Sequence, residues 1–180
     1  ASVRHYAYLN AAFESGIENP IDQAIVAAGQ KAGLATAGYS KIDEMPYDFI
    51  RKRLTIVVKA EQDAKTHLII TKGSFKAIMA VCSKAKIAGK DKPLDEATKT
   101  RLQALLDKNG DEGFRVLAVA TRNVAAQADY GIKDERDMKP GGFLLLDDRH
   151  KAQSQKAIDH RWGRGVRRAG VHGENRHGRT

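Results

Sequence analysis

The sequence predicts an α+β fold in which an antiparallel β-sheet is flanked by helices. Two observations support this prediction. Strand-like runs of β-branched and apolar residues occur as a closely spaced pair at 53–60 and 66–73, and again at 114–122 and 141–147. Amphipathic, helix-like stretches precede and separate these pairs, without the regular strand–helix alternation that is typical of a parallel sheet.

The first helices are indicated by apolar spacing and by a capping signal. Residues 5–14 carry aromatic and aliphatic side chains at spacings of three and four. Asn19 followed by Pro20 predicts the start of a second helix, which ends near Gly29. Residues 30–43 are small and polar, and we interpret them as a loop.

The middle of the chain predicts a hairpin and two more helices. Only a short polar connection separates the runs 53–60 and 66–73, which indicates antiparallel pairing. Ser74 is the predicted N-cap of a helix over 74–85, and a second amphipathic helix follows over 95–110. The two later strands then complete the sheet.

The composition is that of a folded, water-soluble protein. Of 180 residues, 42% are hydrophobic and 29% are charged, which is ordinary for a globular domain. No apolar run approaches the roughly 18 residues that a membrane span needs. The single cysteine, Cys82, excludes a disulfide framework and a cysteine-based zinc site. The first residues do not resemble a secretory signal.

The net charge of +9 belongs mostly to the last part of the chain. Residues 149–180 hold nine Lys or Arg, two acidic residues and few large apolar side chains. Such a segment cannot bury enough surface to offset its ordering entropy. We therefore expect one domain over 1–148 and a basic, low-order tail over 149–180. The tail, with Trp162 as its one aromatic residue, leaves open a nucleic-acid-binding function.

Other motifs that carry chemistry do not fit the sequence. The glycine-rich stretch 33–41 lacks the strand and the lysine position of a phosphate loop. Cys82 with His67 would offer a nucleophile and a base, but Cys82 is expected on the buried face of a helix, where a thiol is inert. The histidines of the tail do not have the spacing of metal ligands. We predict no catalytic residue and no metal ligand.

The stretch 41–53, KIDEMPYDFIRKR, carries the strongest chemical signal. Strand alternation would place Phe49, Arg51 and Arg53 on one face. An aromatic ring beside guanidinium groups suits a nucleotide, because the ring stacks on the base and the cations face the phosphates. On spacing alone, a solvated hairpin with Phe49 in the core is the favoured interpretation.

Two further cations stand at the ends of predicted strands. Lys72 ends the second strand of the hairpin beside Gly73, where a backbone can approach a ligand closely. Arg115 opens the strand FRVLAVATR.

These blocks, in this order, resemble the nucleotide-binding domain of P-type ATPases. DEMPYDFIRKRLTIVV is similar to the family's stretch with the adenine-stacking aromatic residue, IITKGSFKAIMAVC to its Lys-Gly-Ala motif, and GFRVLAVATR to its Gly-(Leu/Phe)-Arg-Val-Leu-Ala-x-Ala strand. GFLLLDD resembles the segment that returns to the phosphorylation domain. YLNAAFESGIENPIDQAI and KIDEMPYDF resemble the patterns of the bacterial magnesium-importing subfamily. The likeness covers about residues 3–148.

The resemblance implies an ATP site. Phe49 would stack on adenine, with Tyr47 as the substitute if Phe49 proves buried. Asp22, where the family has Glu, would accept a hydrogen bond from the adenine amino group. Arg51 and Arg53 would lie near the ribose and the phosphates.

Three more residues complete the implied site. Lys72 would line the floor of the adenine pocket, and Gly73 would give the ring room. Arg115 would reach toward the phosphate chain. Ser74 replaces the alanine of the family's motif, a small departure that leaves the site intact.

The resemblance also implies a role within a larger pump. The chain would be the ATP-binding domain of a magnesium-transporting P-type ATPase, with Mg²⁺ accompanying the nucleotide in the full-length protein. Its partners would be the phosphorylation and actuator domains, at the cytoplasmic face of the bacterial plasma membrane; the isolated chain would be soluble. The phosphorylated aspartate of Asp-Lys-Thr-Gly-Thr is absent from these residues, so the chain alone is expected to bind ATP without hydrolysing it. Whether an N-terminal edge strand is missing is left open.

The tail departs from the family. Ala157-Ile158, Gly165-Val166 and Gly173-Glu174-Asn175 stand at nearly the family's spacing, but the apolar strand before the last motif reads RRAGVH. We interpret 149–180 as a degenerate start of the phosphorylation domain. A structural relic that no longer binds nucleotide is the second alternative.

Overall fold

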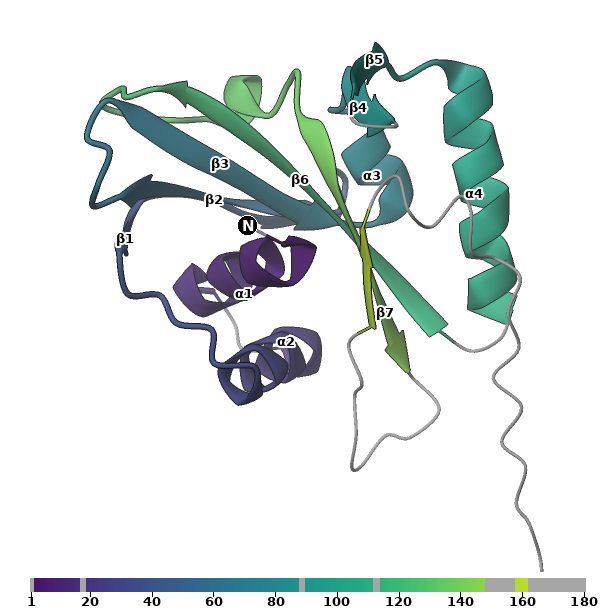
Figure 1. Ribbon diagram of the computed structural model, residues 1–180, viewed down its shortest axis with the longest axis horizontal. Helices are drawn as coiled ribbons and strands as arrows, with labels where there is room; N and C mark the ends of the chain where they lie inside the picture. The colour runs from purple at the N-terminus through teal and green to yellow at the C-terminus, as the bar shows by residue number, and fades with distance from the viewer. Residues whose placement is uncertain (1, 17–18, 88–89, 112–113, 148–157, 162–180) are drawn as a thin grey trace, which may run out of the picture.

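The computed structural model describes residues 2–16, 19–87, 90–111, 114–147 and 158–161. Its centre is formed by three strands, β2 (Arg53–Ala60), β3 (Thr66–Gly73) and β6 (Phe114–Ala125). They lie in a six-stranded antiparallel sheet of order β1-β2-β3-β6-β7-β8, with helices on its two faces (Figure 1). The predicted fold class is therefore confirmed.

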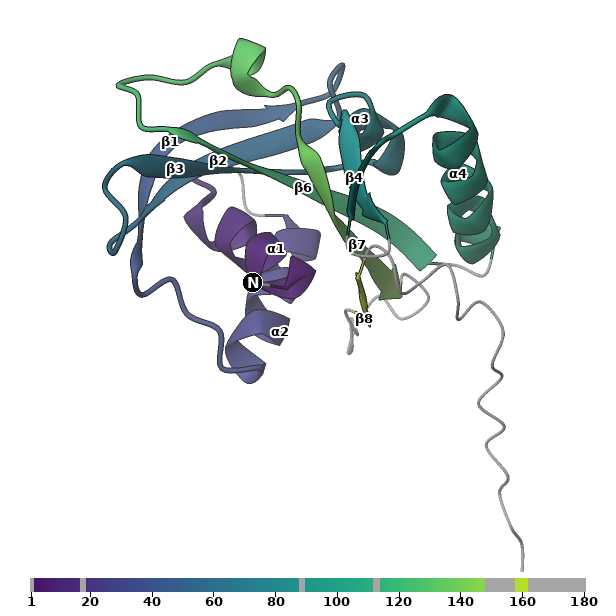
Figure 2. The same cartoon turned by 45° about the horizontal axis from the view of Figure 1, so that its top comes forward.

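The remaining elements are, in chain order, α1 (Val3–Phe13), α2 (Pro20–Lys31), β1 (Tyr39–Asp48), α3 (Phe75–Met79), β4 (Lys84–Ile87), β5 (Lys90–Pro93), α4 (Glu96–Asp111), the 3₁₀ helix η1 (Ile132–Asp134), β7 (Lys139–Asp147) and β8 (Ile158–Arg161). β4 and β5 form a separate two-stranded sheet. Figure 2 shows β8 beside β7 at the end of the main sheet.

The helices begin where the sequence places polar caps. Asn19 accepts a hydrogen bond from the backbone N–H of Asp22 at 3.0 Å, with Pro20 in the first turn of α2. Ser74 caps α3, and Asp95 accepts from Thr98 N–H at 2.7 Å at the start of α4. These caps satisfy backbone donors that have no partner within the helix.

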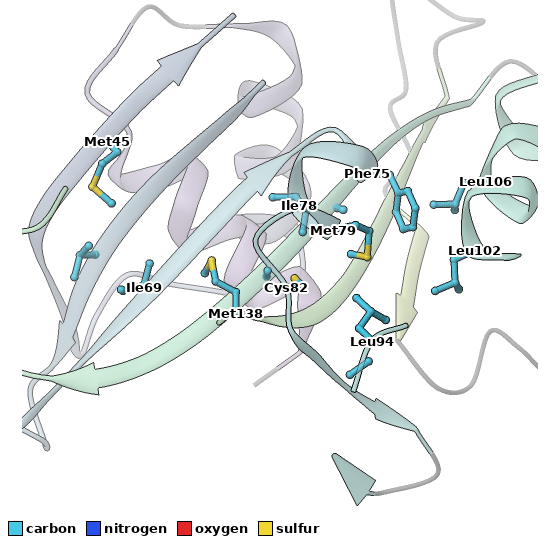
Figure 3. Packing of buried hydrophobic residues seen from close by; sticks show 14 of the residues in the cluster. Met45, Ile69, Phe75, Ile78, Met79, Cys82, Leu94, Leu102, Leu106 and Met138 are labelled. Atoms are coloured by element: carbon cyan, nitrogen blue, oxygen red, sulfur yellow. The ribbon is translucent and has the colours of Figure 1, made fainter. Parts of the chain in front are cut away.

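The sheet separates two hydrophobic cores. Alternation along β2 and β3 sends Ile56 and Ile70 toward α1 and α2, and sends Val57 and Ile69 toward α3 and α4. Figure 3 shows the second core, in which side chains of α3, α4 and the segment before β7 meet the sheet. All four of these β2 and β3 side chains are fully buried, so the central strands are covered on both faces.

Two predictions about local structure are wrong. Residues 39–48 form β1, although the stretch up to 43 was expected to be a loop. A register shift between Lys41 and Asp43 breaks the period of two that would have marked a strand. The helix expected over 74–85 ends at Met79. Beyond it Val81 and Met138 pair through the backbone at 2.9 Å, so a tertiary contact overrides the helical pattern.

The C-terminal tail is described only at residues 158–161. These four residues pair with β7 as β8, so the expected lack of regular structure does not hold for them. The rest of the predicted tail, including Trp162 and the motifs from Gly165 to Asn175, lies outside the described residues.

Candidate functional site

A buried ion pair joins the sheet to the two N-terminal helices. Lys72 is 5% exposed, and its ammonium group contacts the carboxylate of Asp22 near the start of α2. A second carboxylate, that of Glu14 just after α1, has its Oε2 atom 3.7 Å from Lys72 Nζ. The three side chains lie on the α1–α2 face, because Lys72 pairs with Leu54, a residue of that core.

The two carboxyl groups around Lys72 have different proton affinities. Burial, together with the hydrogen bond to Asp22 and its charge, raises the pKa of Glu14 to about 7. Burial also acts to raise the pKa of Asp22, but the charge of Lys72 and hydrogen bonds from Glu14, Lys72 and Asn19 outweigh it and lower that pKa. Near neutral pH, Asp22 is therefore the ionised partner of Lys72, and the Glu14 carboxyl group is partly protonated.

The same cluster extends to β1 through Glu44. The hydroxyl group of Ser15 donates to Glu44 Oε2 at 2.6 Å, and its backbone N–H donates to the same atom at 3.2 Å. This contact holds the end of α1 against the edge strand of the sheet.

Next to this cluster, the β1–β2 turn presents aromatic surface to solvent. Phe49 is 86% exposed and Tyr47 is 49% exposed, and their rings meet edge to face with centroids 5.4 Å apart. Asp48 holds the turn by accepting from the N–H groups of Ile50 and Arg51 at 2.6 and 2.8 Å. The interpretation of Phe49 as a core residue is therefore wrong, and a face of its ring is open to a ligand.

Arg51 and Arg53 converge on a carboxylate that the sequence analysis did not single out. Glu135 Oε1 and Oε2 accept from Arg51 Nη1 at 2.7 and 2.9 Å, and Oε2 accepts from Arg53 Nε at 2.7 Å. Thr55 Oγ1 adds a fourth hydrogen bond at 2.7 Å. Thr55 and Arg53 lie on the strand face opposite to Leu54 and Lys72, so this network lies on the α3 side of the sheet.

Gly73 and Arg115 occupy different parts of the same sheet. A Cβ on Gly73 would collide with the backbone oxygen of Lys52 and would lie 2.8 Å from Arg53 Cα, so the absent side chain makes room for the start of β2. Arg115 is exposed on β6. Alternation places it on the α1–α2 face, with Leu117 and the Lys72 partner Val119.

The structure thus brings only part of the predicted site together. Asp22 and Lys72 are in contact, Arg115 shares their face, and Phe49 lies in the adjoining turn. The two arginines of the turn region point to the other face. The role of each residue toward a nucleotide stays a prediction.

Sequence reasoning missed two acidic residues, for different reasons. Glu14 lies four residues after Asn10, a spacing that puts both on one face of a helix, and this could have indicated that it faces the sheet. Glu135 stands in the charged stretch IKDERDMK, which has no period, and nothing local distinguishes it from Asp134.

Two features are absent from the described part of the chain. No helix among those residues is both long and apolar enough to cross a membrane. In the same residues, no three side chains of the metal-binding types gather at one place.

Comparison with known proteins decides the family. Residues 9–156 match the family described as P-type ATPase, cytoplasmic domain N. The chain belongs to this family. As a member of this family, it is an N domain.

The N domain is similar to several curated proteins. It is 31% identical over 159 residues to "Magnesium-transporting ATPase, P-type 1" of Escherichia coli K12, covering 87% of this chain and 18% of that protein. The Salmonella typhimurium 14028s protein of the same name is 33% identical over the same length, with 87% of this chain and 17% of that protein covered. "Calcium-transporting ATPase" of Bacillus subtilis is 28% identical over 145 residues, covering 78% and 16%. The chain thus spans less than a fifth of each of these relatives.

Proposed function

We propose that the N domain binds ATP for a magnesium-transporting P-type ATPase. Adenine stacks on the aromatic turn, and the γ-phosphate is presented to an aspartate of a separate phosphorylation domain. Mg²⁺ accompanies the triphosphate in the full-length pump, where the phosphorylation and actuator domains are the partners. The pump lies in the bacterial plasma membrane with this domain on the cytoplasmic side. The family and the named magnesium-transporting relatives support this proposal.

One structural observation carries the proposal: an exposed aromatic turn adjoins a buried Lys–Asp pair at the same end of the sheet. Lys72 pairs with Leu54, one register position from the Arg53–Gly73 pair where the turn begins. Phe49 offers a π-face for a base. Asp22 and Lys72 offer an acceptor and a donor, the polar groups that distinguish one base edge from another.

The expected affinity is low. Stacking of one base contributes roughly 1–3 kcal/mol, and cation–phosphate contacts at an exposed site add modestly. The total is about −4 to −6 kcal/mol, a dissociation constant in the high-micromolar to millimolar range. Such weak binding suits a domain that must release the nucleotide in each cycle.

An NMR titration of the ¹⁵N-labelled full chain with ATP, and separately with GTP, tests the proposal. We expect localised shifts at Asp22, Phe49 and Lys72 that are larger with ATP. Phe49→Ala should weaken ATP and adenosine alike and leave the free energy of unfolding within about 0.5 kcal/mol of wild type, because the ring is exposed.

Ile50→Ala is the matched control, since Ile50 is 93% exposed in the same turn and has no aromatic face. It should leave both affinities unchanged. A well-dispersed spectrum that does not change at millimolar ATP would refute the proposal. If Phe49→Ala has no effect and Tyr47→Ala abolishes the shifts, the stacking role moves to Tyr47.

A further inference from the structure

Glu135 carries a buried carboxylate whose two oxygens both accept hydrogen bonds. Its side chain is 0% exposed, and its two oxygens accept four hydrogen bonds from Arg51, Arg53 and Thr55. Thr55 Oγ1 also lies 2.7 Å from Thr71 Oγ1, which extends the network to β3. Burying a carboxylate is costly unless partners of this kind replace its water, so the contact is built into the fold.

The network connects segments that are far apart in the chain. Glu135 follows η1 in the connection between β6 and β7, whereas Arg51 belongs to the β1–β2 turn, 84 residues earlier. The exposed side chains of Phe49 and Ile50 make few contacts that could fix their position. Long-range anchoring of the turn by side chains comes from Arg51, which also donates to Pro46 O at 2.8 Å, and from Arg53 behind it.

This arrangement engages three of the guanidinium nitrogens through which the two arginines could contact a phosphate. Arg51 Nη1 and Nη2 and Arg53 Nε are engaged, and the two side chains are only 14% and 13% exposed. Contact with phosphate on the Lys72 side would require these bonds to break and both side chains to leave the α3 face. A charge-assisted, bidentate contact of this kind is among the stronger hydrogen-bonded pairs.

We infer that Glu135 is a positioning residue: it holds the aromatic turn in its nucleotide-binding position through Arg51 and Arg53, which therefore do not bind phosphate. This inference rests on the proposed function. It differs from the site implied by the family resemblance, because it assigns the two arginines to the turn and leaves the triphosphate to other cations.

The ratio of ATP to adenosine affinity separates the two assignments. Both ligands are titrated into the ¹⁵N-labelled full chain, as wild type, Glu135→Gln and Arg51→Gln. If the arginine acts through the turn, each variant weakens ATP and adenosine by the same factor, threefold or more, and the ratio stays at its wild-type value. If Arg51→Gln lowers the affinity for ATP but not for adenosine, Arg51 contacts phosphate and the inference is wrong. Unchanged affinities in both variants also overturn it.

Arg136→Gln is the matched control, because it removes one positive charge from an exposed position next to Glu135. It should change neither affinity. If Glu135→Gln does not fold, the affinities of Arg51→Gln decide between the two assignments. Thr55→Val, which removes one hydrogen bond to the Glu135 carboxylate, should also weaken ATP and adenosine alike, by a smaller factor.

A readout without nucleotide distinguishes this inference from the proposed function. The ¹⁵N heteronuclear NOE of the Phe49 and Ile50 amides should fall in Glu135→Gln while the central strands keep their wild-type values. Wild-type protein that binds neither ligand refutes the proposed function, whatever the NOE shows. An unchanged NOE at the turn with normal ATP binding refutes the positioning role alone.

Discussion

The backbone oxygen of Lys52 lies directly over the Cα of Gly73, in the space that a side chain on that glycine would fill. Lys52 has a φ of 52°, in the left-handed region, and its oxygen accepts from Ser74 N–H at 3.1 Å. The close approach of these two residues closes the β1–β2 turn against the end of β3. The family resemblance implies that Gly73 gives a base room. The fold also requires glycine at this position, because Lys52 O occupies the space that a side chain would need.

Gly73→Ala should destabilise the protein even without ligand. The new Cβ would press on backbone atoms, Lys52 O and Arg53 Cα, which cannot rotate away. We expect a loss of about 1–3 kcal/mol in the free energy of unfolding, the usual cost of overpacking, measured by urea denaturation. Gly131→Ala is the control, because open space surrounds that position. Equal stability of the two variants would contradict the close packing of Gly73 against Lys52 and Arg53.

Removing Lys72 alone should lower the free energy of unfolding more than removing the charges of Lys72 and Asp22 together. Lys72→Met leaves Asp22 buried without its partner, for which we expect a loss of roughly 3–5 kcal/mol. Combining it with Asp22→Asn should restore part of this stability, because the uncompensated charge is gone. A double-mutant cycle in urea measures the coupling. Strictly additive effects would show that the two groups do not interact.

Glu14 should make stability depend on pH. Its pKa is raised in the folded state, from 4.5 to about 7, so the folded protein binds the proton more tightly than the unfolded chain. Its contribution is fully present below about pH 4.5 and is lost as pH rises through about 7. The free energy of unfolding of Glu14→Gln relative to wild type should therefore rise over this window and then level off.

A flat difference between Glu14→Gln and wild type from pH 4.5 to 7 would contradict this prediction. It would mean that the Glu14 carboxyl group titrates in the folded protein as it does in the unfolded chain.

Cys82 should be chemically inert in the folded protein. Its side chain is 6% exposed, and burial raises the pKa of the thiol to about 12, so the reactive thiolate is scarce. A disulfide reagent such as DTNB should modify native protein far more slowly than protein unfolded in urea. Modification of the native chain at the rate of a small free thiol would place Cys82 at the surface.

Local sequence signals predicted most of the fold, because they report physics that is local. Asn19 and Ser74 cap their helices as expected, and the β-branched runs form β2, β3 and β6. The α4 helix continues to Asp111, one residue past its predicted range of 95–110. The failures come from contacts distant in sequence: the bulge in β1 and the pairing of Val81 with Met138 have no local signature.

In the candidate site, too, local signals were predictable from the sequence and contacts between distant residues were not. The contact of Lys72 with Asp22 agrees with the grouping that the resemblance implied. The face taken by Arg51 and Arg53 was not foreseeable from a strand period, because residues 49–52 form a turn and Glu135 joins them from 82 to 84 positions away. Simple alternation cannot describe a segment whose direction is set by a distant carboxylate.

The burial of β2 and β3 on both faces has a consequence for how ligand binding can be observed. The backbone amides of Ile56, Val57, Ile69 and Ile70 lie under side chains that are fully buried. Their hydrogen exchange should therefore proceed only through global unfolding. A ligand that binds the folded state slows such exchange by the factor 1 + [L]/Kd, about elevenfold at ten times Kd. Exchange at strands that do not touch the nucleotide would thus measure the affinity of a site that is too weak for many direct assays.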